Sequence, residues 1–427
     1  MSGADAARDR ADPTQDRAGA SGALAGIRVL DLTRVLAGPW ATQVLGDLGA
    51  EVFKIERPRG GDDTRAWGPP DVPGAGYSSY YASCNRSKRS VAIDFASPEG
   101  RELIVSLART ADVLVENFKV GGAARHGFDY ATLEAVNPRL IYCSITGFGQ
   151  TGPYAPRAGY DAMMQGMGGL MSITGRSEGE AGSGPQKVGV AMIDLSTGLY
   201  AAIAILAALL QRARTGRGQY IDLALLDVSV ALLANQGMSF LATGLAPKPP
   251  GNAHPSIVPY QDFPTRDGHF MLAIGNDRQF AAFCACAGHP EWALDPRYAT
   301  NPQRVAHRTE LVPMLARATR TRSTSEWVEA LERQSVPCGP INDIAEVFAD
   351  PQVAARGLRV DIPSAGGASV PGIASPLRLS AAPVQYALPP PALGAHTREV
   401  LEQVLALDGA RIRDLDARGV IYVAPLS

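Results

Sequence analysis

Short apolar runs alternate with amphipathic stretches through the first half of the chain. An apolar run at 27–32 is followed by apolar residues at helical spacing from Ala41 to Leu48, and then by a second apolar run at 52–55. Apolar positions three and four residues apart favour a helix with one buried face, whereas short apolar runs favour buried strands. A strand, a helix and a strand in this order predict two parallel strands joined by a crossover helix.

The same alternation continues to about residue 225. Ser97 and Pro98 predict the start of a helix, because serine is a frequent N-cap and proline fits the first helical position. Further short apolar runs predict strands at 91–95, 113–115, 140–145 and 218–225. Alternating strands and helices are typical of an α/β domain with a doubly wound parallel sheet, in which the turns after the strands lie along one edge.

The second half of the chain has a different pattern. Asp227 begins a stretch that predicts a long helix, and proline, glycine and histidine then become frequent near residue 247. Beyond this point an Asp-Gly pair at 267–268 predicts a turn between two short strands, whereas the proline-rich stretch 336–341 predicts no regular element. Asn276 is suited to cap an apolar helix, and Ser323 with Glu326 fits a capping box. These short units predict a second, smaller α+β domain.

The chain therefore divides into four predicted parts. Residues 1–23 carry no long apolar run and predict a disordered tail, and residues 24–228 form the first part of a large domain. Residues 247–345 form the smaller domain. Residues 355–427, which include a final helix from Thr397, return to the large domain.

Composition and charge limit the classes of partner. The 427 residues are 46% hydrophobic and 19% charged, which allows a large buried core, and the formal net charge is -2. This charge predicts a protein that binds neither nucleic acid nor a membrane surface. The apolar run at 199–210 lies between Asp194 and Arg212 and is shorter than the roughly 20 residues that cross a bilayer, so we expect a buried helix.

The cysteines point to a reduced protein. The chain has five of them, an odd number without a framework of spacings, which predicts a cytoplasmic protein without disulfides. Cys284 and Cys286 form the one close pair, and neither a second pair nor a histidine pair accompanies them. We therefore expect no metal site.

Basic residues follow several predicted strands. The turn after the first strand lacks the pattern G-x-G-x-x-G, and no G-x-x-x-x-G-K-[ST] occurs, which disfavours a dinucleotide or a P-loop nucleotide. Cations at the carboxyl edge of a parallel sheet can still bind another phosphate-bearing ligand. The residues predicted to converge there are Arg34, Arg57, Arg86, Lys88 and Arg125. Each of them alone is equally consistent with a solvated surface side chain.

A glycine-rich stretch at 159–194 is the candidate for the chemistry. It carries Glu178 and Glu180 in a predicted turn and runs into the apolar stretch that would anchor it. Small residues leave room for a ligand, and glycine gives the backbone freedom to present a reacting carboxylate. The alternative is a surface loop whose glutamates are merely solvated.

Five motifs in order resemble those of one family. They are AGIRVLD at 25–31 with AGP at 37–39, KIER at 54–57, VENF at 115–118, TGFGQ at 146–150 and TGRGQ at 215–219. Together they resemble the class III CoA-transferases, the CaiB/BaiF type, from residue 24 to 421. Within that family the stretches 61–70, 189–194 and 256–261 are most similar to those of succinyl-CoA:glutarate CoA-transferases.

The resemblance implies a fold and a ligand. The family has a large Rossmann-like domain and a small domain in each chain, and two chains interlock as rings in a homodimer. It binds no permanent cofactor; a coenzyme A thioester is its substrate. The positions that match its CoA site are Arg34, Val35, Ala37, Arg57, Ile93, Asp94, Asn117, Phe118 and Arg125.

The resemblance also implies a nucleophile. The family's catalytic aspartate falls at Glu178, three positions after Gly175, with Glu180 as the alternative. A carboxylate that attacks a thioester gives a mixed anhydride, and the CoA thiolate then converts it to an enzyme glutamyl-CoA thioester. The expected activity moves CoA from a short acyl-CoA such as succinyl-CoA to a carboxylic, most simply dicarboxylic, acid. Arg65 is a candidate for holding a distal carboxylate of that acid.

Two other functions stay open from the sequence. A 2-methylacyl-CoA racemase belongs to the same family, and Asp194 matches the racemases' acidic base, but Tyr160 stands where their histidine partner would be. The longer Glu178 in place of aspartate is also compatible with a CoA-binding protein that has lost catalysis.

Overall fold

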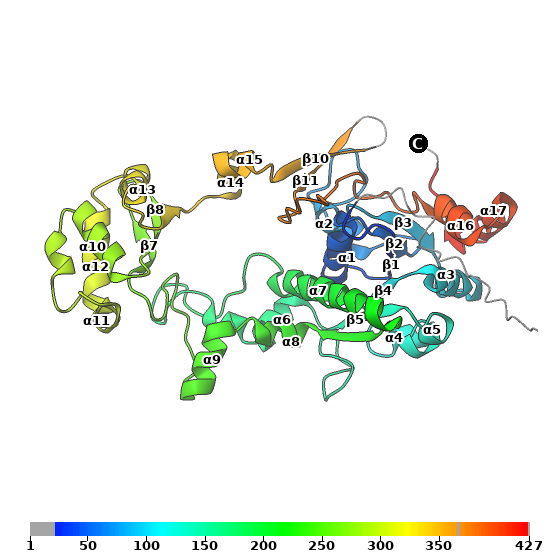
Figure 1. Ribbon diagram of the computed structural model, residues 1–427, viewed down its shortest axis with the longest axis horizontal. Helices are drawn as coiled ribbons and strands as arrows, with labels where there is room; N and C mark the ends of the chain where they lie inside the picture. The colour runs from blue at the N-terminus through cyan, green and yellow to red at the C-terminus, as the bar shows by residue number, and fades with distance from the viewer. Residues whose placement is uncertain (1–21, 365–367, 426–427) are drawn as a thin grey trace, which may run out of the picture. The chain divides into compact units, whose positions relative to one another are not determined.

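The computed structural model describes residues 22–364 and 368–425, and within them the chain forms two compact units (Figure 1). The larger unit takes the residues up to Gly168, Gly189–Leu233 and the residues from Ala354, and the smaller unit takes Gly169–Val188 and Ala234–Val353. Of the predicted tail at 1–23, only the last two residues lie inside the described part of the chain. The two units are described separately.

A seven-stranded sheet forms the centre of the larger unit as described (Figure 1). Its strands, in spatial order, are β12 (Ile421–Tyr422), β3 (Arg89–Ile93), β2 (Glu51–Glu56), β1 (Arg28–Asp31), β4 (Val113–Glu116), β5 (Ile141–Thr146) and β6 (Tyr220–Ala224). All neighbours pair in parallel except β12, which is antiparallel to β3. The order from β3 to β6 is the one found in doubly wound dinucleotide-binding folds. The predicted α/β class with a large parallel sheet is confirmed.

Helices and a hairpin complete this unit. They are α1 (Ala37–Asp47), η2 (Asp63–Ala66), α2 (Ser79–Cys84), α3 (Pro98–Thr110), α4 (Gly122–Arg125), α5 (Tyr130–Val136), α6 (Asp161–Met167), α7 (Met192–Thr215), α8 (Leu225–Ala231), β10 (Arg359–Pro363) with β11 (Ser369–Ile373), α16 (Thr397–Leu405) and α17 (Gly409–Ala417). As predicted, Ser97 caps α3 by accepting the backbone N–H of Gly100, and Pro98 opens it.

The two faces of the sheet are covered by different helices. Leu30 packs in one core with Ile104 of α3 and Leu401 of α16. Its neighbour Asp31 accepts a hydrogen bond from Thr42 of α1. Because successive side chains of a strand point to opposite faces, α1 and α3 lie on opposite sides of the sheet.

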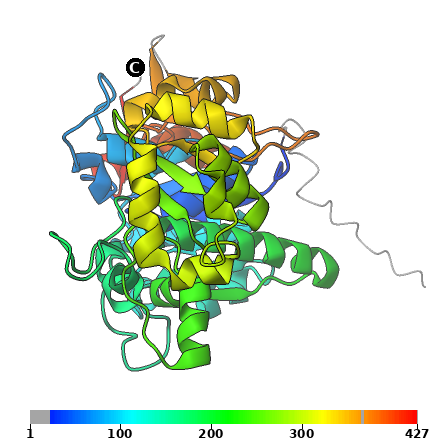
Figure 2. The same cartoon turned by 90° about the vertical axis from the view of Figure 1, so that its left-hand side faces the viewer.

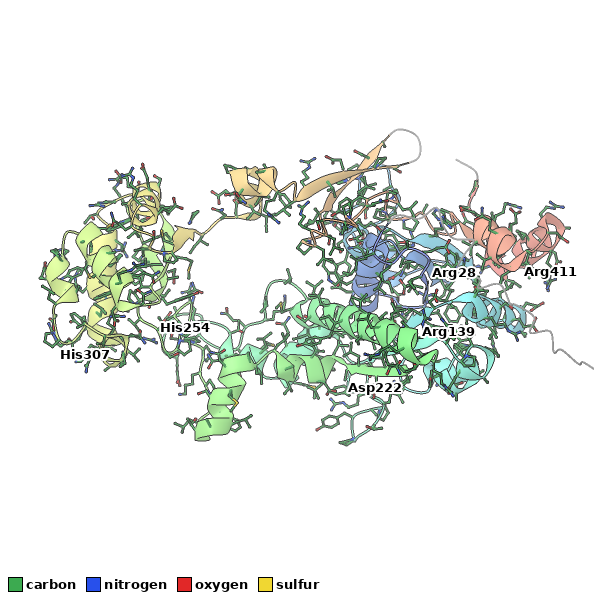
Figure 3. The ribbon with its side chains drawn as sticks, in the orientation of Figure 1. Arg28, Arg139, Asp222, His254, His307 and Arg411 are labelled. Atoms are coloured by element: carbon green, nitrogen blue, oxygen red, sulfur yellow. The ribbon has the colours of Figure 1, made fainter. Side chains whose placement is uncertain are left out.

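The apolar run at 199–210 lies in a helix longer than predicted. Helix α7 has 24 residues, and near its end Arg212 donates to the backbone oxygen of Arg139, 3.1 Å away, and to the carboxylate of Asp112. Arg139 is labelled in Figure 3. By length and composition α7, whose most apolar window has a mean hydropathy of 1.9, could cross a membrane, as could α8 and the following helix α9 (Ala234–Thr243) taken together. It packs against α1, however, and core helices pass the same test.

The smaller unit is an α+β arrangement around a three-stranded antiparallel sheet (Figure 2). Its elements are η3 (Leu170–Ile173), α9 (Ala234–Thr243), β7 (Tyr260–Pro264), β8 (His269–Ala273), α10 (Asp277–Cys286), η4 (Pro290–Ala293), α11 (Asn301–Ala306), α12 (Arg308–Thr319), α13 (Thr324–Glu332), β9 (Cys338–Pro340), α14 (Ile344–Ala349) and α15 (Pro351–Ala355). Phe270 and Phe283 stack on Trp327 at its core.

The structure confirms both helix caps predicted in this unit. Asn276 caps α10, and Ser323 with Glu326 forms the predicted capping box of α13. Two expectations were wrong. The proline-rich stretch at 336–341 contains β9, which pairs with β8. In the larger unit, the long helix expected from Asp227 is the short α8, which ends at Ala231.

Candidate active site

The turns after β1, β4 and β5 surround a cavity of about 490 Å³ in the larger unit, the main cavity. Its lining includes Arg34, Val35, Asn117, Phe118, Thr146 and Asp194. A smaller side cavity of about 220 Å³ shares Arg34, Asn117 and Phe118 with it and adds Arg57. Both lie at the carboxyl edge of the parallel sheet, where ligands of such folds bind.

The turn after β1 has a fixed, strained backbone. Val35 has a φ of 72°, which is unfavourable for a β-branched residue, and its N–H donates to Oδ1 of Asp62 at 3.3 Å. The Asn117 side chain bonds both polar groups of the Arg34 backbone, accepting from N at 3.1 Å and donating to O at 2.8 Å. The sequence therefore predicts the turn, but residues from two other segments set its conformation.

One carboxylate joins the two cavity arginines. Asp63 accepts a hydrogen bond from Nη1 of Arg34 at 2.9 Å and one from Nη2 of Arg57 at 2.7 Å. All three side chains are more than a third exposed. Asp63 therefore holds two cations side by side at an accessible surface, where an anionic ligand can reach them.

A buried ion network lies beneath this turn. Nζ of Lys54 donates to Oδ2 of Asp62 at 2.9 Å and to the Thr33 backbone oxygen at 3.1 Å, and neither charged side chain is more than 1% exposed. Burial alone would raise the pKa of Asp62, but Lys54 and the hydrogen bonds from Thr64 lower it to about 2. Through these bonds the buried ion pair holds the turn after β1, which lines the cavity, against the core.

This shift predicts an acid-sensitive fold. A carboxyl group whose pKa is lower in the folded than in the unfolded chain stabilises the fold above its unfolded pKa and loses that contribution as the pH falls. For Asp62 the loss falls between about pH 4 and pH 2 and amounts to on the order of 2 kcal/mol. Thermal unfolding of Asp62→Asn followed across this range should show a shallower loss of stability than the unsubstituted protein; an identical loss would contradict the assignment.

Three of the basic residues proposed as ligand contacts form ion pairs within the protein instead. Lys88 is fully buried and ion-paired with Asp31, and Arg86 is buried against Asp47. Arg65 donates to Glu56 from two nitrogens and lies over the Tyr81 ring, 3.9 Å from its centroid. The expectation that Arg86 and Lys88 converge on a phosphate site, and that Arg65 is available for a distal carboxylate, was therefore wrong.

Of the remaining residues matched to a CoA site, one lines the main cavity and three lie outside both cavities. Ala37 begins α1 and lines the main cavity. Ile93 is buried in β3, Asp94 accepts the backbone N–H of Ala96, and Arg125 ends α4; none of these three lines either cavity. Their role in binding stays a prediction.

Glu178 belongs to the smaller unit and lies in an exposed turn. Oε2 of Glu178 accepts from Nζ of Lys248 at 2.5 Å, and the backbone N–H of Gly251 donates to the oxygen of Gly175 at 3.1 Å. The hydrogen bond and charge of Lys248 lower the pKa of Glu178, so the carboxylate is ionised at neutral pH. Glu180 is exposed in the same turn, with its N–H donated to Ser177.

Asp194 is a cavity residue to which sequence reasoning gave no role in the transfer. It lies in the first turn of α7, is only 8% exposed and lines the main cavity. Burial, followed by the charge of Asp161, raises the pKa of Asp194 to about 7. The sequence signal was present, because an acidic residue stands at the start of a long apolar helix, but its burial is a tertiary property.

The described residues also bear on metals and disulfides. No group of three or more His, Cys, Asp or Glu side chains within 22–364 and 368–425 is arranged to hold a metal ion. All five cysteines are free thiols.

Comparisons with known proteins agree on a family. The chain matches the model of CoA-transferase family III over residues 24–397. It is 52% identical over 389 residues to a succinate–glutarate CoA-transferase of Agrobacterium fabrum, covering 90% of this chain and 96% of that protein. It is 46% identical over 400 residues to the human succinyl-CoA:glutarate CoA-transferase, covering 93% and 90%. A crystal structure of a CaiB/BaiF family protein from Brucella suis superposes with a TM-score of 0.80 at 50% identity, covering 90% of this chain and all of that one. The chain therefore belongs to CoA-transferase family III.

Proposed function

We propose that this enzyme transfers CoA from succinyl-CoA to a second short dicarboxylic acid, such as glutarate. The observation that carries the proposal is the pair of cavity arginines at the carboxyl edge of the sheet, in a chain about half identical to transferases named for succinate and glutarate. The paired arginines suit the phosphates of CoA, and the relatives' names supply the acyl groups.

The CoA site in this proposal spans both cavities. Arg34 and Arg57 contact the phosphates, because guanidinium groups make charge-assisted, often bidentate, bonds to them. Asn117, Phe118, Val35 and Ala37 complete the walls. Ile93, Asp94 and Arg125 are proposed to contact more distant parts of CoA. CoA enters and leaves as substrate, and no permanent cofactor takes part.

Glu178 is the proposed nucleophile. Its ionised carboxylate attacks the carbonyl carbon of succinyl-CoA, the carbon–sulfur bond breaks, and CoA leaves while an enzyme–succinyl anhydride forms. The sulfur of CoA then attacks the Glu178 carbonyl, which releases succinate and leaves a glutamyl-CoA thioester. The acceptor acid repeats both steps in reverse order and leaves as the new thioester. Each intermediate retains the activation of the original thioester.

The glycine-rich turn supports this chemistry. Gly175 and Gly179 have φ values of 126° and 90°, conformations that other residues rarely adopt. Backbone N–H groups in such a turn can donate to the oxyanion that forms when the carboxylate attacks. Water must be excluded from the anhydride, because it would hydrolyse it.

A racemase has less support. The acidic base expected of one matches Asp194, but Tyr160, an exposed phenol on the main cavity, takes the place of its histidine. Deuterium from solvent should therefore not enter the α-carbon of a 2-methylacyl-CoA.

We further propose an interlocked homodimer in the cytoplasm. Leu199, Ile203 and Leu210 of α7 are 48%, 61% and 71% exposed in the single chain, which is unusual for a helix in the centre of a fold. A second copy would cover such a surface. Free thiols in all five cysteines fit a reducing compartment.

An acceptor panel tests the function. Purified enzyme is mixed with succinyl-CoA and one acid at a time, and the CoA products are identified by mass spectrometry. We expect glutarate and acids of similar length to accept CoA and monocarboxylates to accept it poorly. Failure of every acid to exchange would refute the proposal.

Replacing an arginine of the proposed CoA site should weaken substrate binding without slowing the chemical step. Arg57→Ala should raise the KM for succinyl-CoA about tenfold and leave kcat nearly unchanged, because a phosphate far from the thioester is bound equally in the ground and transition states. Arg217→Ala is the matched control, since Arg217 is also exposed and paired with one carboxylate, that of Glu134, but lines neither cavity. A fall in kcat at unchanged KM would contradict the assignment.

A further inference from the structure

The loop that follows β5 brings Arg157 to the main cavity. The residue is exposed and does not line the side cavity. Among the residues that the structure describes, its side chain has neither an ion pair nor a hydrogen bond. Arg34, by contrast, is bonded to Asp63. The N–H donors of Arg157 are therefore available to an anion in the cavity.

Two aromatic rings hold the guanidinium group of Arg157 in place. Its central carbon lies over the ring of Phe148, 5.1 Å from the centroid, and over that of Tyr154 at 4.6 Å. The two rings meet edge to face at 5.5 Å, and Phe148 is buried. Aromatic faces attract the charge of a guanidinium group without occupying its N–H donors. The side chain is thus oriented before a ligand binds, which reduces the entropy that binding costs.

The two ends of this loop are in backbone contact. A Cβ atom added at Gly159 would lie 2.7 Å from Cα of Gly147, and one added at Gly147 would lie 2.8 Å from Cα of Gly159. Glycine allows two backbones to approach this closely. The backbone N–H of Gln150 also donates to the carboxylate of Asp222 in β6 at 3.1 Å. These contacts anchor the loop, and Arg157 near its closing point, to the sheet.

Arg157 lies toward a different strand from the arginines proposed for the phosphates. Arg57 follows β2 and Arg157 lies in the loop after β5, and these strands are three positions apart in the sheet. Neighbouring strands are about 4.8 Å apart, so the ends of β2 and β5 are separated by about 14 Å. A CoA thioester whose phosphates contact Arg34 and Arg57 carries its acyl group at its other end. An acyl group directed toward the β5 side of the main cavity meets Arg157.

We propose that Arg157 determines the specificity of the transfer by binding the distal carboxylate of the acyl group. Succinyl and glutaryl groups carry a carboxylate at the end remote from the thioester, and a guanidinium group binds a carboxylate through two parallel hydrogen bonds. Arg65, the earlier candidate for this role, is paired with Glu56. A monocarboxylic acyl group ends in a methyl group and leaves the guanidinium group without a partner. The inference rests on the proposed CoA transfer and names the residue that selects its substrates.

The test compares Arg157→Gln with Arg109→Gln on two matched substrate pairs. The first pair is succinyl-CoA with glutarate, and the second is butyryl-CoA with valerate, in which a methyl group replaces each distal carboxylate. We expect Arg157→Gln to lower kcat/KM for the first pair about a hundredfold and to leave that for the second within about threefold. Arg109, which is exposed in the last turn of α3 and lines neither cavity, is the control, and Arg109→Gln should change neither value.

Binding of free CoA separates recognition of the acyl group from recognition of the phosphates. Free CoA has every phosphate and no acyl group, so its Kd, measured by calorimetry, should be the same in Arg157→Gln as in the unsubstituted enzyme. The KM for glutarate should rise about tenfold or more. Arg157→Lys retains the charge but not the paired hydrogen bonds and should recover part of the loss. Weaker binding of free CoA with equal losses on both substrate pairs would overturn the inference.

A second cation of the main cavity provides a further test. Lys119 also lines this cavity and has no ion pair in the part of the chain that the structure describes. Loss of the preference for dicarboxylates in Lys119→Gln but not in Arg157→Gln would overturn the inference. An unchanged preference in Arg157→Gln would do the same and leave CoA transfer standing. Absence of exchange with every acid in the unsubstituted enzyme would instead refute the function, and this inference with it.

Discussion

Glu178→Ala is expected to lower kcat for CoA transfer by about a thousandfold or more, because removing a covalent nucleophile removes the route through the anhydride. The fold should be unaffected, since the Glu178 side chain is 76% exposed and, among the residues that the structure describes, forms an ion pair with Lys248 alone. The measurement is a steady-state rate with succinyl-CoA and glutarate, together with mass spectrometry of the trapped acyl-enzyme.

The neighbouring glutamate provides the control for this variant. Glu180→Ala changes the same exposed turn and should retain most of the activity. If Glu180→Ala is inactive and Glu178→Ala is not, the nucleophile is Glu180. Retention of activity in both variants would exclude a nucleophile from this turn.

Lys54→Met is expected to destabilise the larger unit by about 3–5 kcal/mol. Lys54 lies 2.9 Å from the Asp62 carboxylate and close to two further buried acids, Asp31 and Glu56, whose charges raise the pKa of Lys54 against the effect of burial. Removing the cation leaves buried negative charge without compensation. The loss is measured as a fall in the midpoint of thermal or urea unfolding.

A second variant shows that charge, and not packing, is responsible. The double substitution Lys54→Met with Asp62→Asn removes the charges of both partners and should recover part of the loss, because a buried pair costs much less to replace than to break. Lys187→Met, at an exposed lysine outside any ion pair of the described chain, should change stability by less than about 0.5 kcal/mol. A double variant less stable than the single one would contradict this explanation.

The parallel core of the sheet was predictable from local periodicity. Strands β1 and β2, with α1 between them, follow directly from apolar runs and helical spacing, and the N-cap of α3 follows from Ser97 and Pro98. Strand β12 was missed because it has two residues and exists only through its pairing with Ile93, far away in the chain. Non-local pairing leaves little trace in a short window of sequence.

The candidate site was predictable only in part, for a related reason. The positions of Arg34 and Arg57 after successive strands indicated an anion site, and both line the cavities. The same reasoning included Arg86, because its partner Asp47 lies on a separate helix and the pairing cannot be read from spacing. Asp194 was the converse case, since nothing in the neighbouring sequence reveals that it is buried and lines the cavity.

The pairing of β12 with β3 has a consequence for biosynthesis. During translation β3 emerges early, yet its outer edge is completed by Ile421 and Tyr422, which are synthesised far later, and α16 and α17 supply Leu401 and Ile412 to the core over β3. Until β12 has been synthesised, that edge and the apolar surface of Ile93 have no native cover. The nascent polypeptide thus depends on late arrival of the segment that carries α16, α17 and β12 to avoid edge-to-edge association, and a stop codon that removes this segment should yield insoluble product.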